Sequence, residues 1–328
     1  MAVAHEADWS GIGWDSWKNL RLIRARLDAG ADPNIGGFFH RRPLHAAAEC
    51  GSPDVVAELA ARVDDVDAEH EGRTALWAAV FANRPDNVRV LVQAGADPWR
   101  PMMNGWSPGR LSLATPAPDL FDDHAGRPGR PGRPGLSGAE AAAVAEARHL
   151  IAAVGDSYDD GMGLACVAGI SAAEAVRRLE AVPADAAEVE EIAEDPWSHM
   201  DESLGVVGVT DVPGGCVVSQ PWGYGPYMPG VTKLLSAGTV CYAMFANPKS
   251  GNQGSVTRDG EIVDWDTHPG GGSPYPEQPA GEILIEYLYQ GNAMAYCCAG
   301  AGLRLDDAAP IAGEPDMWVR LPERDYWS

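Results

Sequence analysis

The chain has 328 residues, of which 45% are hydrophobic and 22% are charged, so it can form two globular domains. Its formal net charge of −23 argues against a nucleic-acid partner, because binding to phosphates requires concentrated lysine and arginine. Residues 1–135 carry 15 basic and 18 acidic side chains, whereas residues 136–328 carry 9 and 29. The acidity therefore belongs to the C-terminal part.

The sequence also predicts the cellular location of the protein. Residues 1–8 are short and acidic, and no later run is apolar over the roughly 18 residues that a membrane span needs. We therefore expect a cytoplasmic protein without a membrane partner. The six cysteines lack metal-ligand spacing, so we expect buried, reduced thiols and no cofactor. Arginine outnumbers lysine 21 to 3, a bias that resembles GC-rich bacterial genomes.

A repeat with a period of about 32 to 33 residues runs through the N-terminal part. The segment Arg42–Ala48 aligns with Thr74–Val80, and the same shift reaches Ser107–Gly109. Independently, Leu27–Pro33 recurs two periods later as Val92–Pro98. A fixed period of this size indicates a stack of helical repeats.

These segments resemble the ankyrin repeat, which opens with a Thr-Pro-Leu-His turn, continues through two antiparallel helices and closes on Gly-Ala-Asp. The resemblance implies an all-α ankyrin solenoid over residues 10–114, with about three repeats, of which the first and last are atypical. Residues 102–108 are expected to begin a capping element. The expected core comprises Leu44, Val55, Val56, Leu59, Leu76, Val88, Leu91 and Val92.

The resemblance also implies that the repeats bind a protein partner through their hairpin tips and the concave face of the inner helices. Aromatic, methionine and arginine side chains are the usual anchors of such an interface. The candidate partner-binding residues are Phe38, Phe39, His40, Arg41, Glu49, His70, Phe81, Trp99, Arg100 and Met102. Alternatively, Phe39 and Trp99 cover the edge of the stack or dock on the C-terminal domain. His45 is expected to be a structural hydrogen-bonding residue.

Residues 115–138 are rich in proline and repeat Gly-Arg-Pro three times, which predicts an extended, semi-rigid linker. Residues 139–328 then predict an acidic α+β domain with a mainly antiparallel sheet. A helix is expected over 139–154, and another begins after Ser171, which has capping-box spacing to Glu174. The expected strands are 206–210, 216–220, 240–246, 254–258, 261–265, 283–289 and a short one near Val319. Cys297 and Cys298 are also expected on a strand.

The C-terminal half resembles an uncharacterised domain family of GC-rich actinobacteria. The resemblance rests on the segments Cys166–Ile170, Ala175–Leu179, Trp222–Gly225, Leu234–Thr239 and Asp259–Val263. That family has no established function, so the resemblance supports a domain boundary and implies no chemistry.

Two features of this half are candidates for chemistry. Asp264, Asp266 and His268 alternate, so an extended strand would present all three on one face, as a metal or acid/base site needs. The polar outer face of an edge strand explains the same pattern. The aromatic segment Trp222–Tyr227 fits a ligand-stacking loop or a cover for the domain's own core.

The sequence therefore predicts a non-enzymatic bacterial adaptor that binds a partner through its ankyrin surface. One version is an immunity- or antitoxin-like protein, because an acidic surface speeds association with a basic effector. The alternative is an enzyme or small-ligand sensor whose site lies in the C-terminal α+β domain.

Overall fold

The computed structural model describes residues 8–35, 42–122, 134–155, 160–198 and 200–327. The chain divides into two compact units. Unit 1 comprises residues 1–141 and 274–287, and unit 2 comprises residues 142–273 and 288–328. Residues 274–287, called the inserted segment below, are therefore part of the repeat unit, although the sequence assigned them to the C-terminal domain. The three Gly-Arg-Pro repeats lie almost wholly outside the described residues.

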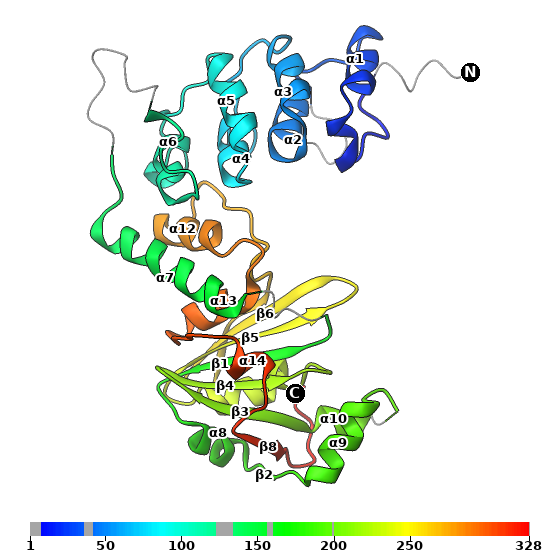
Figure 1. Ribbon diagram of the computed structural model, residues 1–328, viewed down its shortest axis with the longest axis vertical. Coiled ribbons are helices and arrows are strands. Elements are labelled where there is room, and N and C mark those ends of the chain that lie inside the picture. The colour runs from blue at the N-terminus through cyan, green and yellow to red at the C-terminus, as the bar shows by residue number, and fades with distance from the viewer. Residues whose placement is uncertain (1–7, 36–41, 123–133, 156–159, 199, 328) are drawn as a thin grey trace. The chain divides into compact units, whose positions relative to one another are not determined.

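Unit 1 consists of short helices that follow one another in pairs (Figure 1). They are η1 (Trp14–Lys18), α1 (Leu20–Asp28), α2 (Pro43–Cys50), α3 (Pro53–Ala60), α4 (Ala75–Phe81), α5 (Pro85–Gln93), η3 (Met103–Gly105), α6 (Pro108–Leu111) and η4 (Ser112–Ala114). Helix α2 packs against α4, and α3 packs against α5. Two further helices, α7 (Gly138–Val154) and α12 (Ala280–Leu288), each contain residues of both units.

The starts of these helices are specified locally. Ser52, Thr74 and Ser107 each accept, through the side-chain oxygen, a hydrogen bond from the backbone N–H three residues later. Such a cap contributes about 1 kcal/mol to stability. Pro43 and Pro85 occupy the first turn of α2 and α5, where the missing N–H costs nothing. The repeat period seen in the sequence is therefore a period of helix starts.

Small and aliphatic side chains fill the space between successive helix pairs. Ala47 and Ala79 are both fully buried, at equivalent positions of α2 and α4. The expected core is confirmed except at Val92, which is only partly buried. Asn87 on α5 is buried and donates its amide N–H groups to carbonyl oxygens of the neighbouring pair, including those of Ala48 and Gly51. The repeats are thus joined by both apolar and polar contacts.

Unit 2 is built on an antiparallel sheet in the strand order β2-β8-β3-β4-β1-β5-β6-β7. The strands are β1 (Gly163–Ala168), β2 (Val182–Pro183), β3 (Val206–Val212), β4 (Gly215–Gln220), β5 (Val240–Asn247), β6 (Gly251–Arg258), β7 (Glu261–Thr267) and β8 (Met317–Arg320). The antiparallel α+β expectation is therefore confirmed for the C-terminal region. An Asp-Gly turn joins β6 to β7, with positive φ at Asp259 and Gly260.

Helices cover both faces of this sheet. They are α8 (Ala172–Leu179), α9 (Ala186–Glu194), α10 (Met200–Leu204), η6 (Gly225–Tyr227), α11 (Pro229–Leu235), α13 (Ala293–Gly300) and α14 (Ala309–Ala312). Ala165 and Val167 of β1 share one core with α8 and α11. Cys166, between them, faces the other way and lies 3.7 Å (Sγ to Sγ) from Cys298 on α13. All six cysteines are free thiols, and all but Cys50 are buried.

Two expected strands were wrong. The run 283–289 belongs mainly to helix α12, and Cys297 and Cys298 lie in helix α13. In α12 the buried side chains are Ile283, Leu284 and Tyr287, a spacing of one and four residues that suits a helix. The described part of the chain contains no helix that is both long and apolar enough to cross a bilayer.

We predict that Leu76→Ala lowers the free energy of unfolding of the repeat unit by about 2–5 kcal/mol, because this fully buried side chain would leave a cavity. Chemical denaturation of the full chain, followed by helical circular dichroism, measures the loss. Val92→Ala, at the partly exposed position, is the control and should cost much less. Equal, small losses in both variants would contradict the packing described above.

Candidate protein-binding surface

The structure describes six of the ten candidate partner-binding residues. Phe38, Phe39, His40 and Arg41 lie outside the described residues. Glu49 lies on the last turn of α2 and Phe81 ends α4, while His70, Trp99, Arg100 and Met102 lie in the connections between helix pairs. All six side chains are partly exposed. These six residues therefore lie on the inner helices and in the connections between helix pairs.

The best-defined tip is the turn between His70 and Arg73. These residues exchange two backbone hydrogen bonds of 2.8 and 3.0 Å, and Glu71 and Gly72 between them have positive φ. His45 of the inner helix α2 supports the tip, because its Nε2 lies 2.9 Å from the carbonyl oxygen of Arg73. Burial lowers the pKa of His45 to about 4. His45 is thus a neutral structural residue that fixes the tip.

The next hairpin tip, which contains Trp99 and Arg100, is held by charged and aromatic contacts. The carboxylate of Asp67 accepts a hydrogen bond from the backbone N–H of Asp97 at 3.0 Å, and Arg100 forms an ion pair with Glu69 at 2.6 Å. The ring of Trp99 lies 6.2 Å from that of Phe121, measured between centroids. Trp99 also lies close against Gly109, where a Cβ atom would be only 2.7 Å from the ring. These contacts give Trp99 a structural role inside unit 1.

Phe81 contacts the inserted segment. Its ring centroid lies 5.6 Å from that of Tyr287, in an edge-to-face arrangement, and 6.4 Å from that of Trp77. The hydroxyl of Tyr287 donates a hydrogen bond of 2.7 Å to Oδ1 of Asn83, two residues beyond Phe81. The end of helix α4 therefore already has one aromatic partner within unit 1.

Trp106 is the second point at which the inserted segment is attached to the repeats, and it was not among the candidate partner-binding residues. Its side chain is fully buried, and its Nε1–H donates to the carbonyl oxygen of Ala280 at 2.9 Å. The guanidinium of Arg110 lies 4.3 Å above the Trp106 ring, and its Nη2 donates to both carboxylate oxygens of Glu140, at 2.8 and 2.9 Å. The expected capping element after residue 102 thus centres on Trp106.

A third attachment reaches the tip at Gly72. The side-chain amide of Asn104 donates to the carbonyl oxygen of Gln278 at 3.1 Å. The ring of Pro276 lies so close to Gly72 that a Cβ there would be 2.5 Å from Cγ of the proline. The contacts of the inserted segment therefore run from a hairpin tip, past Asn104 and Trp106, to the end of α4. The only local signal for this in the sequence is the run of prolines at 274, 276 and 279.

The acid/base candidates in unit 2 do not share an uninterrupted strand. Asp266 has a φ of +56°, and the pairing of β6 with β7 shifts register at two places. Asp264, Asp266 and His268 are exposed, and Nδ1 of His268 lies 3.1 Å from the carbonyl oxygen of Asn252. Within the described ranges, no group of three or more His, Cys, Asp or Glu side chains is arranged to hold a metal ion.

The aromatic loop of unit 2 packs within its own unit. Trp222 stacks on Trp318 with ring centroids 5.3 Å apart, and Tyr227 stacks on Trp265 at 5.1 Å. The fully buried side chain of Gln220 holds the loop start, since its Oε1 accepts the N–H of Gly225 at 2.8 Å. These contacts favour the structural interpretation of residues 222–227.

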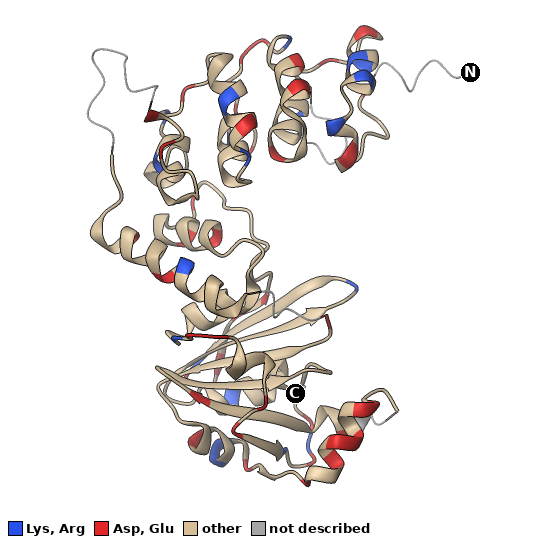
Figure 2. Cartoon of the chain, in the orientation of Figure 1, with Lys and Arg blue, Asp and Glu red and all other residues tan. Residues whose placement is uncertain are grey.

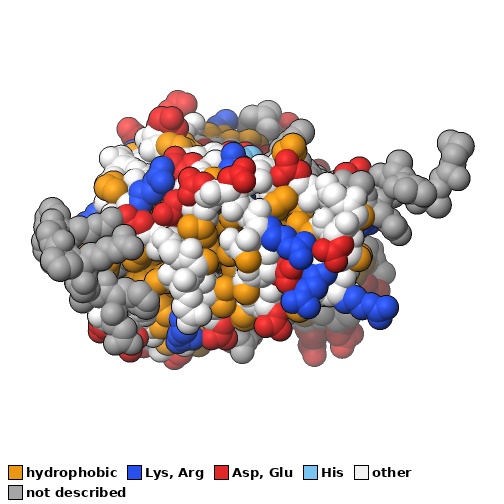
Figure 3. Space-filling model, turned by 90° about the horizontal axis from the view of Figure 1, so that it is seen from above, with side chains coloured by type: hydrophobic (Ala, Val, Ile, Leu, Met, Phe, Trp, Pro, Cys, Tyr) orange, Lys and Arg blue, Asp and Glu red, His pale blue; other side chains and the backbone are white. Residues whose placement is uncertain are grey.

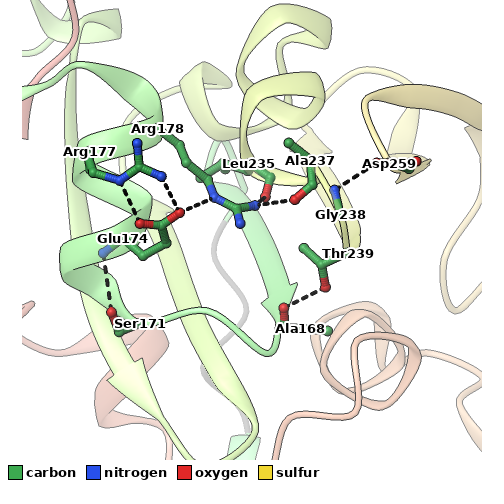
Figure 4. A network of polar contacts seen from close by, with 10 residues as sticks. All are labelled: Ala168, Ser171, Glu174, Arg177, Arg178, Leu235, Ala237, Gly238, Thr239 and Asp259. Carbon is green, nitrogen blue, oxygen red and sulfur yellow. Dashed lines mark hydrogen bonds and ion pairs between the residues drawn. The ribbon is translucent and has the colours of Figure 1, made fainter.

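A polar network joins four of the segments on which the resemblance of the C-terminal half rests, Cys166–Ile170 being joined through the hydrogen bond from Thr239 to the carbonyl oxygen of Ala168 (Figure 4). Arg178 of α8 donates to the carbonyl oxygens of Leu235 and Ala237, both at 2.7 Å. Glu174 accepts from Arg178 at 2.8 Å, and the carboxylate of Asp259 accepts from the N–H of Gly238 at 2.8 Å. These hydrogen bonds tie α8 to the end of α11, and the segment after α11 to the turn between β6 and β7.

We predict that acidification destabilises the repeat unit through His45. The folded pKa of about 4 lies below the ordinary value of 6.5, so neutral His45 stabilises the fold fully above pH 6.5, and this stability is lost as the pH falls towards 4. The loss amounts to about 3 kcal/mol. Comparing the free energy of unfolding of the wild type with that of His45→Gln from pH 7 to 4 removes the shared effect of carboxyl groups. Parallel pH profiles in the two proteins would refute the assignment.

Comparison with known proteins places these features in a family context. Residues 16–102 match the family model described as Ankyrin repeats (3 copies). One relative is Rabankyrin-5 of Homo sapiens, which is 33% identical over 98 residues, corresponding to 29% of this chain and 8% of the relative. The chain therefore spans less than a tenth of that relative's length. The N-terminal part of this chain contains ankyrin repeats, and such repeats are protein-binding modules.

Proposed function

We propose that this protein is an adaptor, and that it binds a protein partner through the tips and inner helices of its ankyrin repeats. The observation that carries the proposal is the match of residues 16–102 to ankyrin repeats. The tip at residues 70–73 supports it, because a buried histidine and two backbone hydrogen bonds hold that tip in one conformation. A pre-organised surface loses little entropy when it binds.

Within this surface, we propose that the partner contacts Glu49, His70, Arg100 and Met102, together with Phe38, Phe39, His40 and Arg41. Figure 3 views the face that is uppermost in Figure 1, where α1, α3 and α5 lie, and charged side chains of both signs are seen there among hydrophobic ones. The proposed contacts lie instead on the inner helices and in the connections between helix pairs. Phe81 and Trp99 stabilise this surface through their ring contacts with Tyr287 and Phe121 inside unit 1.

The finer proposal is that the partner is basic, as an immunity- or antitoxin-like role would require. It rests on the excess of negative charge in residues 136–328, which carry 29 acidic and only 9 basic side chains. Helix α9 carries several of these carboxylates, as Figure 2 shows. Long-range attraction between such a surface and a basic protein speeds their association. The adaptor role itself does not depend on this charge.

We predict that Glu49→Lys and Arg100→Glu each weaken binding of a captured partner to the full chain by at least about tenfold, because reversed rim charges oppose association. Trp197→Ser is the matched control, since this tryptophan of unit 2 is 68% exposed. The partner's affinity should be unchanged in the control. An affinity that depends on Trp197 and not on the repeat residues would refute binding through the repeats.

The same partner tests the charge proposal separately. Its association rate should fall steeply between 0.1 and 1 M salt, because the Debye length shortens from about 10 Å to about 3 Å. A rate that does not change with salt would remove the basic partner from the proposal and leave the repeat surface as the recognition site.

A further inference from the structure

The inserted segment has the geometry of a peptide ligand seated on the repeats. Its first half is a turn, in which the N–H of Gln278 bonds to the carbonyl oxygen of Tyr275 at 3.1 Å and Pro276 lies at the second position. Its second half is helical, beginning after Pro279, whose carbonyl oxygen accepts the N–H groups of Glu282 and Ile283. Proline is favoured at the second position of such a turn because it fixes φ in advance.

A side-chain brace joins the turn to the helix. Nε2 of Gln278 donates to the carboxylate of Glu286 at 2.6 Å, and Gln278 is only 4% exposed. The docked segment is therefore held by contacts within itself as well as by its contacts with the repeats.

The repeats recognise the segment in two ways. Asn104 and Trp106 donate to the main-chain carbonyl oxygens of Gln278 and Ala280, which any peptide of this shape presents. Selectivity comes from two side-chain contacts. Pro276 fits over Gly72, which has no Cβ, and Tyr287 bonds to Asn83 while packing edge-on against Phe81.

We propose that Gly72, Phe81, Asn83, Asn104 and Trp106 form a peptide-binding site, that the inserted segment is its internal ligand, and that the partner presents the same chemistry. That chemistry is a proline-containing turn followed by a short helix with a tyrosine one residue short of its end. This inference rests on the proposed function, because it names the kind of ligand that the repeat surface takes.

A partner must displace the internal ligand before it can bind to this site. It is covalently attached at both ends, so its effective concentration at the site is on the order of millimolar. A free peptide with the same contacts must compete with it and will bind the intact protein weakly. Loss of a single anchor of the internal segment then raises the apparent affinity for the free peptide, with no change in the site itself.

The test uses the full chain and a fluorescein-labelled synthetic peptide of residues 272–290 of this protein, with binding followed by fluorescence anisotropy. Tyr287→Ala removes an anchor from the internal segment, whereas the peptide keeps its own tyrosine. We expect this variant to bind the peptide at least tenfold more tightly than the wild type. Tyr275→Ala is the matched control, because this tyrosine of the same segment is 54% exposed, and it should behave as the wild type.

A second pair of substitutions identifies the site. Phe81→Ala and Asn83→Ala, introduced together into Tyr287→Ala, should abolish the gain in affinity. A folded Tyr287→Ala variant that binds the peptide no better than the wild type would overturn the proposal. A gain that survives loss of Phe81 and Asn83 would do the same, because the peptide would then be bound elsewhere.

Hydrogen exchange on the wild type keeps the test decisive if Tyr287→Ala fails to fold. Excess unlabelled peptide should accelerate exchange of the amides of Gln278 and Ile283 in the protein, and unchanged exchange at saturating peptide would overturn the proposal. Failure of this peptide-binding site can be distinguished from failure of the proposed adaptor function. A partner that depends on Glu49 and Arg100 but is indifferent to Tyr287→Ala would support the adaptor role and refute this site.

Discussion

A stack of repeats must cover its last apolar face, and in this chain that constraint organises the whole of unit 1. Each helix pair buries its alanine and aliphatic side chains only against its neighbours, as Ala47 and Ala79 do. Beyond α5 the repeat pattern fades, and the short helices around Trp106 close the stack. Trp106 is fully buried, lies under the guanidinium of Arg110 and bonds to the backbone of the inserted segment. Closing the stack and docking the segment therefore depend on the same side chain.

Much of unit 1 and most of the sheet could be predicted from the sequence, because their signals are local. The period, the prolines and hydroxyl caps at helix starts, and the Asp-Gly hairpin each specify a few neighbouring residues. The run 283–289 was misassigned because short stretches of isoleucine, leucine and tyrosine suit a strand or a buried helix equally well. What decided its structure lies far away in the sequence, at Asn83 and Trp106.

The candidate site was predictable to a similar degree. The role of His45 follows from its place in the repeat turn, and the structure confirms that it is a hydrogen-bonding structural residue. Phe81 was selected as an anchor for a partner, and it does contact an aromatic side chain, but one from the same chain. The alternating carboxylates in unit 2 assumed a regular strand, and a positive φ at Asp266 interrupts it. No local pattern predicted the register shifts between β6 and β7, and only the prolines at 274, 276 and 279 signalled the inserted segment.

The central claim is that the inserted segment folds as part of the repeat unit, and a double-mutant cycle between Asn83 and Tyr287 tests it most directly. Asn83→Ala, Tyr287→Phe and the double variant isolate the hydrogen bond between the tyrosine hydroxyl and the asparagine side chain. We predict a coupling free energy of about 0.5–1.5 kcal/mol in the stability of the full chain. A coupling of zero, with both single variants folded, would contradict the docking of the segment on the repeats.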